Sequence, residues 1–234
     1  MTVLNLFRSY NTHVDRAYII TIANHATSEM LSQRAQQSCA KAGMPYQVWD
    51  AFDGTGDDIK TPAHSAHSNL MPILKITDHY LTRGEVACVL SHVSLWHHCA
   101  VIDQPIVILE HDAVMVRPLQ YHESYNSIVY LGGSEWTAKG WPMYDIPPHA
   151  SEGPNCHFIC RAHAYSIDPA MAKNLLAHII KMGICAPVDI MIRADLFHIT
   201  HNGLYAYDDP IEETTILARP SQGRSTTRND DLKV

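Results

Sequence analysis

Residues 81–113 read LTRGEVACVLSHVSLWHHCAVIDQPIVILEHDA and decide the fold. The first part predicts a helix over 84–100, in which apolar residues recur at helical spacing. These residues are Val86, Val89, Leu90, Val93 and Trp96. Residues 105–109 form a continuous apolar run, which is typical of a strand covered on both faces of a parallel sheet. The acidic group EHD at 110–112 follows this strand directly, at the carboxyl end where such sheets bind ligands.

The rest of the chain alternates strands with helices. Strands are predicted at 17–22, 46–52, 105–109, 127–131 and 156–166, and helices at 27–42, 84–100 and 169–182. Thr27 or Ser28 is the expected cap of the first helix. The alternation predicts a single-domain α/β fold with a Rossmann-like, mostly parallel sheet flanked by helices. We expect this domain to span 1–219, with an N-terminal extension at 1–15 and a polar, flexible tail at 220–234.

Composition and charge narrow the classes of function. The 234 residues carry a net charge of about −7 and only 17 Lys and Arg, with no basic block. This balance argues against nucleic acid as a partner. The start of the chain lacks the apolar core of a signal peptide, and the longest apolar runs fall far short of a membrane span. We therefore expect a cytoplasmic protein with no transmembrane segment and with reduced, mostly buried cysteines.

Glu110 and Asp112 are two carboxylates that can converge on one divalent cation. Hard oxygen ligands of this kind suit Mg²⁺ or Mn²⁺. Such a cation neutralises a diphosphate and assists its departure as a Lewis acid. An acidic pair after a strand also often caps the next turn, so the pattern by itself leaves a catalytic and a structural role open.

Two blocks of the sequence resemble glycosyltransferase family 25, which includes bacterial lipopolysaccharide sugar transferases and the collagen galactosyltransferases. Residues 81–96, LTRGEVACVLSHVSLW, are similar to the family's LTxGExGCxLSHxxLW, and residues 106–113, IVILEHDA, are similar to its ILEDDA. Weaker similarities extend over most of the chain. They are AFDG at 51–54, AYSI at 164–167 and PVD at 187–189.

The resemblance implies a GT-A-type fold and a nucleotide-sugar donor, UDP-hexose, whose sugar passes to a hydroxyl of a glycan acceptor such as lipopolysaccharide. It also implies dependence on Mn²⁺ or Mg²⁺ and, as is usual in the family, an inverting transfer. Glu110 and Asp112 then become the expected metal ligands. The expected donor-binding residues are Thr21, Asp53, Gly54, Glu85, His92, Glu110 and His111.

Three of the expected site residues have alternative structural roles. Glu85 and His92 lie seven residues apart on one helical face, which reaches the donor if it lies under the acidic group. Alternatively, Glu85 stabilises the helix through its dipole, and His92 is a half-buried, hydrogen-bonded histidine. Asp189 is the expected general base, since inverting transfer needs a carboxylate that takes the acceptor proton. Its place at a predicted helix start makes a capping role the alternative.

Two positions depart from the family pattern. His111 stands where the family usually has Asp, and ITIAN at 20–24 replaces INLxR, so that the Arg of the first strand is lost. The departures bear on donor choice, and they leave open a non-catalytic relative that binds carbohydrate or nucleotide. A metal-dependent hydrolase is a further alternative, although the sequence has no HExxH or HxH arrangement.

Other histidine, cysteine and aromatic groups suggest weaker hypotheses. Cys156, His157, Cys160 and His163 form a compact group, but alternation along a strand places the cysteines opposite the histidines, which argues against zinc. His198 and His201 are candidates for a further metal ligand. The segment 134–155, with Trp136 and Trp141, suits stacking on a sugar or is an ordinary packed loop.

Overall fold

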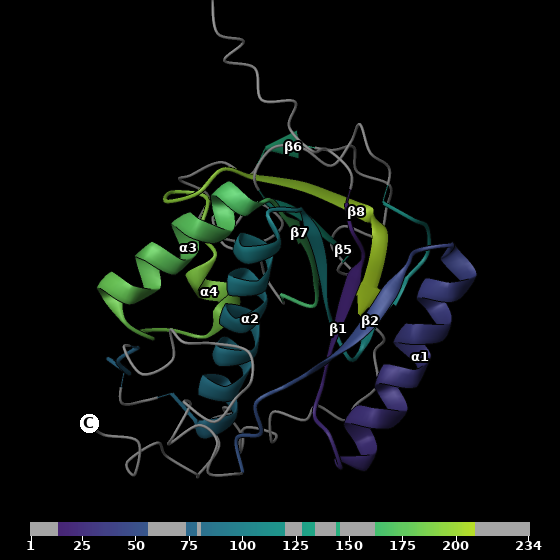
Figure 1. The fold of residues 1–234 in the computed structure, drawn as a ribbon, viewed down its shortest axis with the longest axis horizontal. Coiled ribbons are helices and arrows are strands. Elements are labelled where there is room, and N and C mark those ends of the chain that lie inside the picture. The colour runs from purple at the N-terminus through teal and green to yellow at the C-terminus, as the bar shows by residue number, and fades with distance from the viewer. Residues whose placement is uncertain are drawn as a thin grey trace, which may run out of the picture.

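The computed structural model describes residues 14–55, 74–78, 81–119, 128–133, 144–145 and 162–208. Figure 1 shows a curled sheet with α2, α3 and α4 on one side and α1 on the other. The elements are β1 (Ala17–Thr21), α1 (Ala26–Ala42), β2 (Tyr46–Asp50), α2 (Arg83–Ile102), β3 (Ile106–Glu110), β4 (Ala113–Met115), β5 (Ile128–Gly133), β6 (Tyr144–Asp145), β7 (Ala164–Ile167), α3 (Pro169–Met182), α4 (Val188–Met191) and β8 (Ile199–Asp208). The predicted tail, both tryptophans of 134–155 and residues 156–160 of the Cys/His group lie outside the described residues.

The sheet runs in the order β2-β1-β3-β7-β5-β8-β4, with β6 paired to β8. β1 lies parallel to β2 and β3, with Ile19 opposite Val48 and Leu109. β7 is antiparallel to β3 and β5, and β4 and β6 are antiparallel to β8. The predicted α/β fold with flanking helices is confirmed, but the expected mostly parallel sheet is corrected to a mixed one. The described residues between β3 and β7 contain no crossover helix, which parallel neighbours normally need.

The first three strands create the edge at which a ligand can bind. From β1 the chain passes through α1 to β2 on one side, and α2 then leads to β3 on the other side of β1. The strand order therefore reverses at β1, and the carboxyl ends of the three parallel strands meet at one edge. Crevices at such switch points are the usual binding sites of α/β sheets.

Local capping chemistry sets the helix boundaries. The cap of α1 is His25 rather than Thr27 or Ser28, and its Nδ1 accepts the Ser28 N–H at 3.2 Å. α2 begins with a capping box, in which the Thr82 hydroxyl accepts the Glu85 N–H and the Glu85 carboxylate accepts the Thr82 N–H. α3 begins as its sequence predicts, because the Asp168 carboxylate accepts the N–H of Met171 at 2.7 Å.

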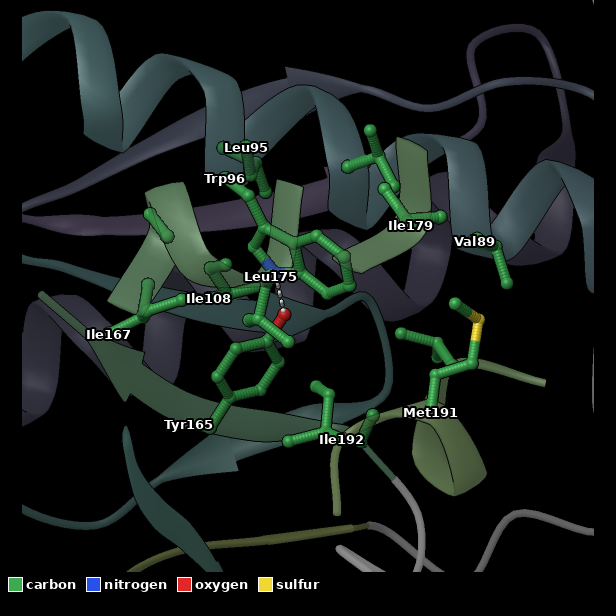
Figure 2. Close-up of a cluster of buried hydrophobic side chains, with 14 of the residues drawn as sticks. Val89, Leu95, Trp96, Ile108, Tyr165, Ile167, Leu175, Ile179, Met191 and Ile192 are labelled. Atoms are coloured by element: carbon green, nitrogen blue, oxygen red, sulfur yellow. Dashed lines mark hydrogen bonds between the residues drawn. The ribbon is translucent and has the colours of Figure 1, made fainter. Parts of the chain in front are cut away.

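Two hydrophobic clusters cover the two faces of the sheet. Ile106 and Ile108 of β3 pack with α2 and α3, whereas Val107 and Leu109 pack on the side of α1. All four side chains are fully buried, which confirms the prediction of a strand covered on both faces. Figure 2 shows the first cluster, in which the rings of Trp96 and Tyr165 meet between the helices and the sheet.

Among the described residues, α2 has the length and apolar composition to cross a membrane, with a mean hydropathy of 1.2 over the window concerned. Of that window, 67% is buried inside the fold. The helix packs against the sheet and α3, so its apolar composition is that of a core helix.

Candidate functional site

A cavity of about 390 Å³ lies at the carboxyl ends of β1, β2 and β3. Ile20, Ile22 and Phe52 contribute apolar surface to its lining. Of the residues expected from the sequence, five line it. They are Asp53, Gly54, His92, Glu110 and His111. The volume falls within the range of roughly 300–1,000 Å³ that small-molecule sites occupy.

Gly54, which follows β2, packs directly against the backbone at the start of α2. A Cβ on Gly54 would lie 2.9 Å from the Cα and N atoms of Gly84 and 3.0 Å from the carbonyl carbon of Arg83. The Arg83 guanidinium Nε donates to the Gly54 carbonyl at 2.7 Å. Since no side chain fits between the two backbones, the AFDG and LTRGE motifs form one continuous wall of the cavity.

Further hydrogen bonds fix the turn that contains Gly54 and the residues just before it. Asp53 accepts hydrogen bonds at 2.8 Å from the N–H and the hydroxyl of Thr55, an Asx-type turn. The Ser91 hydroxyl of α2 accepts the Phe52 N–H at 2.9 Å and donates to the Ala87 carbonyl. These bonds hold the lining residues of the β2 segment against α2.

Glu110 ends β3 with a carboxylate that is 25% exposed. Its Oε1 lies 3.2 Å from His92 Nε2 and accepts a weak bond from the Cys88 thiol at 3.8 Å. Burial alone would raise the pKa of Glu110, but the hydrogen bond and charge of His92, aided by His111 and His163, lower it below its ordinary value. Glu110 is therefore the charged carboxylate of the site at neutral pH.

Asp112 is half-buried, and its Oδ1 is buried with no hydrogen-bond partner within the described part of the chain. Burial, followed by the charge of Glu110, raises the pKa of Asp112 above its ordinary value. A buried carboxylate oxygen without a partner is costly unless a cation or donor satisfies it. Glu110 and Asp112 together therefore fit an oxygen-preferring divalent cation.

A second set of possible ligand atoms overlaps this pair. Atoms of Cys88, His92 and Glu110 all lie within 4.8 Å of one another, and sulfur with imidazole suits a softer cation such as Zn²⁺. Burial and the carboxylates of Glu110, Asp189 and Asp112 hold the pKa of the Cys88 thiol well above its ordinary value. Because the thiol is protonated at neutral pH and both ring nitrogens of His92 are engaged, the oxygen pair is the better cation site.

Asp189 lies in the first turn of α4 and is half-buried. The described lining of the cavity does not include it. The N-cap of α4 is Pro187, so Asp189 does not occupy the capping position. The charge of Asp189 contributes to the raised pKa of the Cys88 thiol. Because Cys88 lines the cavity, α4 brings Asp189 near the side of the cavity that Cys88 forms.

Two expected donor-binding residues lie outside the described lining of the cavity. The Thr21 hydroxyl donates to the Ser32 hydroxyl at 2.7 Å, which ties β1 to α1. Alternation along the strand turns Ile20 and Ile22 to the cavity and Thr21 to the opposite face. Glu85 is 7% exposed and completes the capping box of α2.

His163 lies beside the acidic pair and close to His201. His163 directly precedes β7, and its carbonyl accepts the Glu110 N–H at 2.9 Å. A Cβ on Gly132 would overlap the His163 ring, so this glycine provides the space for it. His201 Nε2 lies 3.1 Å from the Gly132 carbonyl, and its ring stacks on Tyr130. His198 is exposed.

Several residues of the site were not predicted from the sequence. Cys88 and Tyr165 lie inside the motifs that carry the family resemblance, so their positions were a usable signal. His25 and Arg83 also line the cavity. His25 lies outside the motifs, and Arg83 stands at the variable position of LTxGE, so neither residue had a signal of its own.

Comparison with known proteins identifies the family of the chain. The model of glycosyltransferase family 25, described as LPS biosynthesis protein, matches residues 15–140. Among solved structures, an active-site mutant of LgtC is similar, with a TM-score of 0.43 and 11% identity over 79% of this chain and 71% of that chain. No curated protein matches. The family match spans more than half of the 234 residues and includes the cavity, so the chain belongs to glycosyltransferase family 25, a family of transferases.

Proposed function

We propose that the protein transfers a sugar from UDP-hexose to a hydroxyl of a glycan acceptor such as lipopolysaccharide, with inversion at the anomeric carbon and in the cytoplasm. Family membership supports sugar transfer in general. One observation carries the finer proposal: a charged carboxylate, Glu110, stands beside Asp112 at the switch point of the sheet, and one Asp112 oxygen has no hydrogen-bond partner among the described residues. A donor diphosphate is anionic, so it would be repelled here without a cation.

Glu110 and Asp112 would hold Mn²⁺ or Mg²⁺. When bound, the cation supplies charge neutralisation and Lewis-acid assistance to the departing diphosphate. The apolar surface of Ile20, Ile22 and Phe52 suits the planar base of the donor. Asp53, fixed by its turn, offers carboxylate oxygens for ribose hydroxyls.

His111 occupies the central position of the acidic motif and lines the cavity. A carboxylate there could only accept hydrogen bonds, whereas an imidazole can also donate one. We assign His111 to an N–H contact with the donor, which changes donor selectivity relative to relatives with Asp at this position.

Asp189 is the proposed base. It takes the proton of the acceptor hydroxyl as that oxygen attacks the anomeric carbon, while the bond to the diphosphate breaks. Glu110 and Asp112 cannot serve, because they are engaged with the cation. The position of Asp189 near the Cys88 edge of the cavity supports this role.

Thermal and chemical unfolding with UDP tests the proposal. At about 100 times its dissociation constant, UDP should stabilise the fold by roughly 2.7 kcal/mol when Mn²⁺ or Mg²⁺ is present. With chelator the stabilisation should disappear. Equal stabilisation under both conditions would contradict the cation site. Cation binding that UDP does not affect would favour a hydrolase, and binding of neither would favour a non-catalytic relative.

A further inference from the structure

A continuous chain of hydrogen bonds runs from the core to Glu110. Trp96 Nε1 donates to the Tyr165 hydroxyl at 2.8 Å, as the dashed line in Figure 2 shows. The same hydroxyl lies 2.8 Å from His92 Nδ1, and His92 Nε2 lies 3.2 Å from Glu110 Oε1. Trp96, Tyr165 and His92 are fully buried, so Glu110 is the one member of the chain that solvent reaches.

The donor is defined at both ends of this chain. An indole N–H can only donate, so the Tyr165 oxygen accepts from Trp96. The Glu110 carboxylate can only accept while it is ionised, so His92 Nε2 carries a proton and donates to Oε1. His92 Nδ1 lies at hydrogen-bond distance from the Tyr165 hydroxyl, which holds the other side of the ring.

Apolar packing alone does not account for this arrangement. Three polar groups are buried between α2 and β7, where hydrocarbon side chains would avoid the cost of desolvation. His92 and Trp96 are four residues apart and share one face of α2, while Tyr165 lies opposite Ile108 in the pairing of β7 with β3. The three groups come from two sequence motifs and form a series that ends at one carboxylate oxygen, Glu110 Oε1.

We propose that His92, Tyr165 and Trp96 are positioning residues for Glu110. They hold Oε1 towards the core, which leaves Oε2 for the divalent cation of the site. The inference rests on the proposed function, because it concerns the cation that Glu110 and Asp112 would share. Groups that orient metal ligands in this way typically change metal affinity by about 10–100-fold when they are lost.

Tyr165→Phe tests the proposal, because it removes one hydroxyl and keeps the ring in the core. Mn²⁺ is titrated into the protein with UDP present, and binding is followed by calorimetry and by the electron paramagnetic resonance of free Mn²⁺. We expect Mn²⁺ affinity to fall about 10-fold, because His92 loses the hydrogen-bond partner that holds its ring against Glu110. In transfer assays, the Mn²⁺ concentration for half-maximal rate should rise more than the donor KM.

Ser94→Ala is the matched control. The Ser94 hydroxyl is buried on α2, the helix that carries His92 and Trp96. It accepts the indole N–H of Trp49 at 2.9 Å, as the Tyr165 hydroxyl accepts that of Trp96. Both variants therefore remove a buried acceptor from a tryptophan, but only Tyr165 belongs to the chain that reaches Glu110. Ser94→Ala should lower stability and leave Mn²⁺ affinity at the wild-type value.

Two substitutions of His92 separate positioning from packing. His92→Ala should weaken Mn²⁺ binding by about 10–100-fold, and His92→Gln should restore part of it, because an amide N–H can still donate to Glu110. Wild-type Mn²⁺ affinity in folded Tyr165→Phe, or equal losses in Tyr165→Phe and Ser94→Ala, would overturn the positioning role and leave the proposed function standing. A wild-type protein that binds no Mn²⁺ with UDP would overturn both.

Discussion

Glu110 and Asp112 stand two residues apart, yet their surroundings push their pKa values in opposite directions. Glu110 receives the His92 hydrogen bond, whereas Asp112 is half-buried next to the charge of Glu110, and its Oδ1 has no partner in the described part of the chain. In the metal-free site Glu110 therefore stays ionised to lower pH than Asp112 does. A divalent cation favours the ionised form of Asp112, so cation binding should release protons in acidic solution.

Asp112→Asn should lower transfer by roughly 10²-fold or more, because a bound cation contributes several kcal/mol of transition-state stabilisation. The free energy of unfolding without metal should stay near the wild-type value, since the side chain keeps its shape. Rate assays and urea denaturation measure the two effects. Asp103→Asn, an exposed carboxylate at the other end of α2, is the control. Normal turnover in Asp112→Asn would make the acidic motif structural.

Asp189→Asn should lower transfer by about 10²-fold or more, the usual effect of losing a general base, with UDP affinity nearly unchanged. Slow hydrolysis of the donor should fall in parallel if Asp189 also activates water. Asp195→Asn, six residues further on and paired with Arg193, serves as the comparison and should retain full activity. A wild-type rate in Asp189→Asn would remove this residue from the mechanism.

At the scale of elements, α2 connects most parts of the site. Its first residues touch Gly54, its next turns place Cys88 and His92 at the cavity, and Trp96 continues into the core. The capping box fixes where the helix starts, so it also fixes the register of these side chains against β3. A shift of one residue would turn His92 away from Glu110.

Glu85→Ala should lower the free energy of unfolding by about 1 kcal/mol, because the Thr82 N–H loses its acceptor. UDP affinity should remain at the wild-type value, since the Glu85 side chain completes the cap and lies outside the described cavity lining. Glu85→Gln, which keeps an acceptor oxygen, should recover part of the stability. A large loss of UDP affinity with normal stability would instead favour the donor-binding role expected from the sequence.

The sequence predicted those elements whose signals are local. The apolar run at 105–109 identified β3, and the helix predicted at 169–182 matches α3. β8 was not predicted, because Asn202-Gly203 is typical of a turn, whereas the strand continues through it with a register shift opposite β5. Likewise, the family motifs placed Glu110 and His92 at one site, but the Tyr165 contact depends on the pairing of β7 with β3.

At the scale of the whole molecule, acid should destabilise the fold through one buried and one half-buried histidine, His201 and His178. Burial lowers the pKa of His201 and, with the charges of Lys181 and Arg193, that of His178. An unfolded histidine titrates near 6.5, so below about that pH the unfolded state binds more protons. The stability that these neutral rings contribute is complete above the unfolded pKa and is lost as the pH falls towards their folded pKa values.

The expected result is a free energy of unfolding that decreases between pH 7 and pH 5, as measured by urea denaturation. In His201→Gln the decrease should be smaller, because one of the two histidines no longer titrates, while an amide donor remains for the Gly132 carbonyl. His198→Gln, at an exposed position, should keep the wild-type slope. An unchanged slope in His201→Gln would assign the acid sensitivity to other groups.

Every described residue that lines the cavity falls between Ile20 and His111, inside the region matched by the family, whereas Asp189 comes much later in the chain. Under the proposed function, the donor would be bound by one continuous part of the chain, while the base that acts on the acceptor would come from a later part. Substitutions near Asp189 would then alter acceptor use and leave the nucleotide preference unchanged. Tyr165 is the exception, because its substitution would alter the position of Glu110 through the hydrogen bonds of His92.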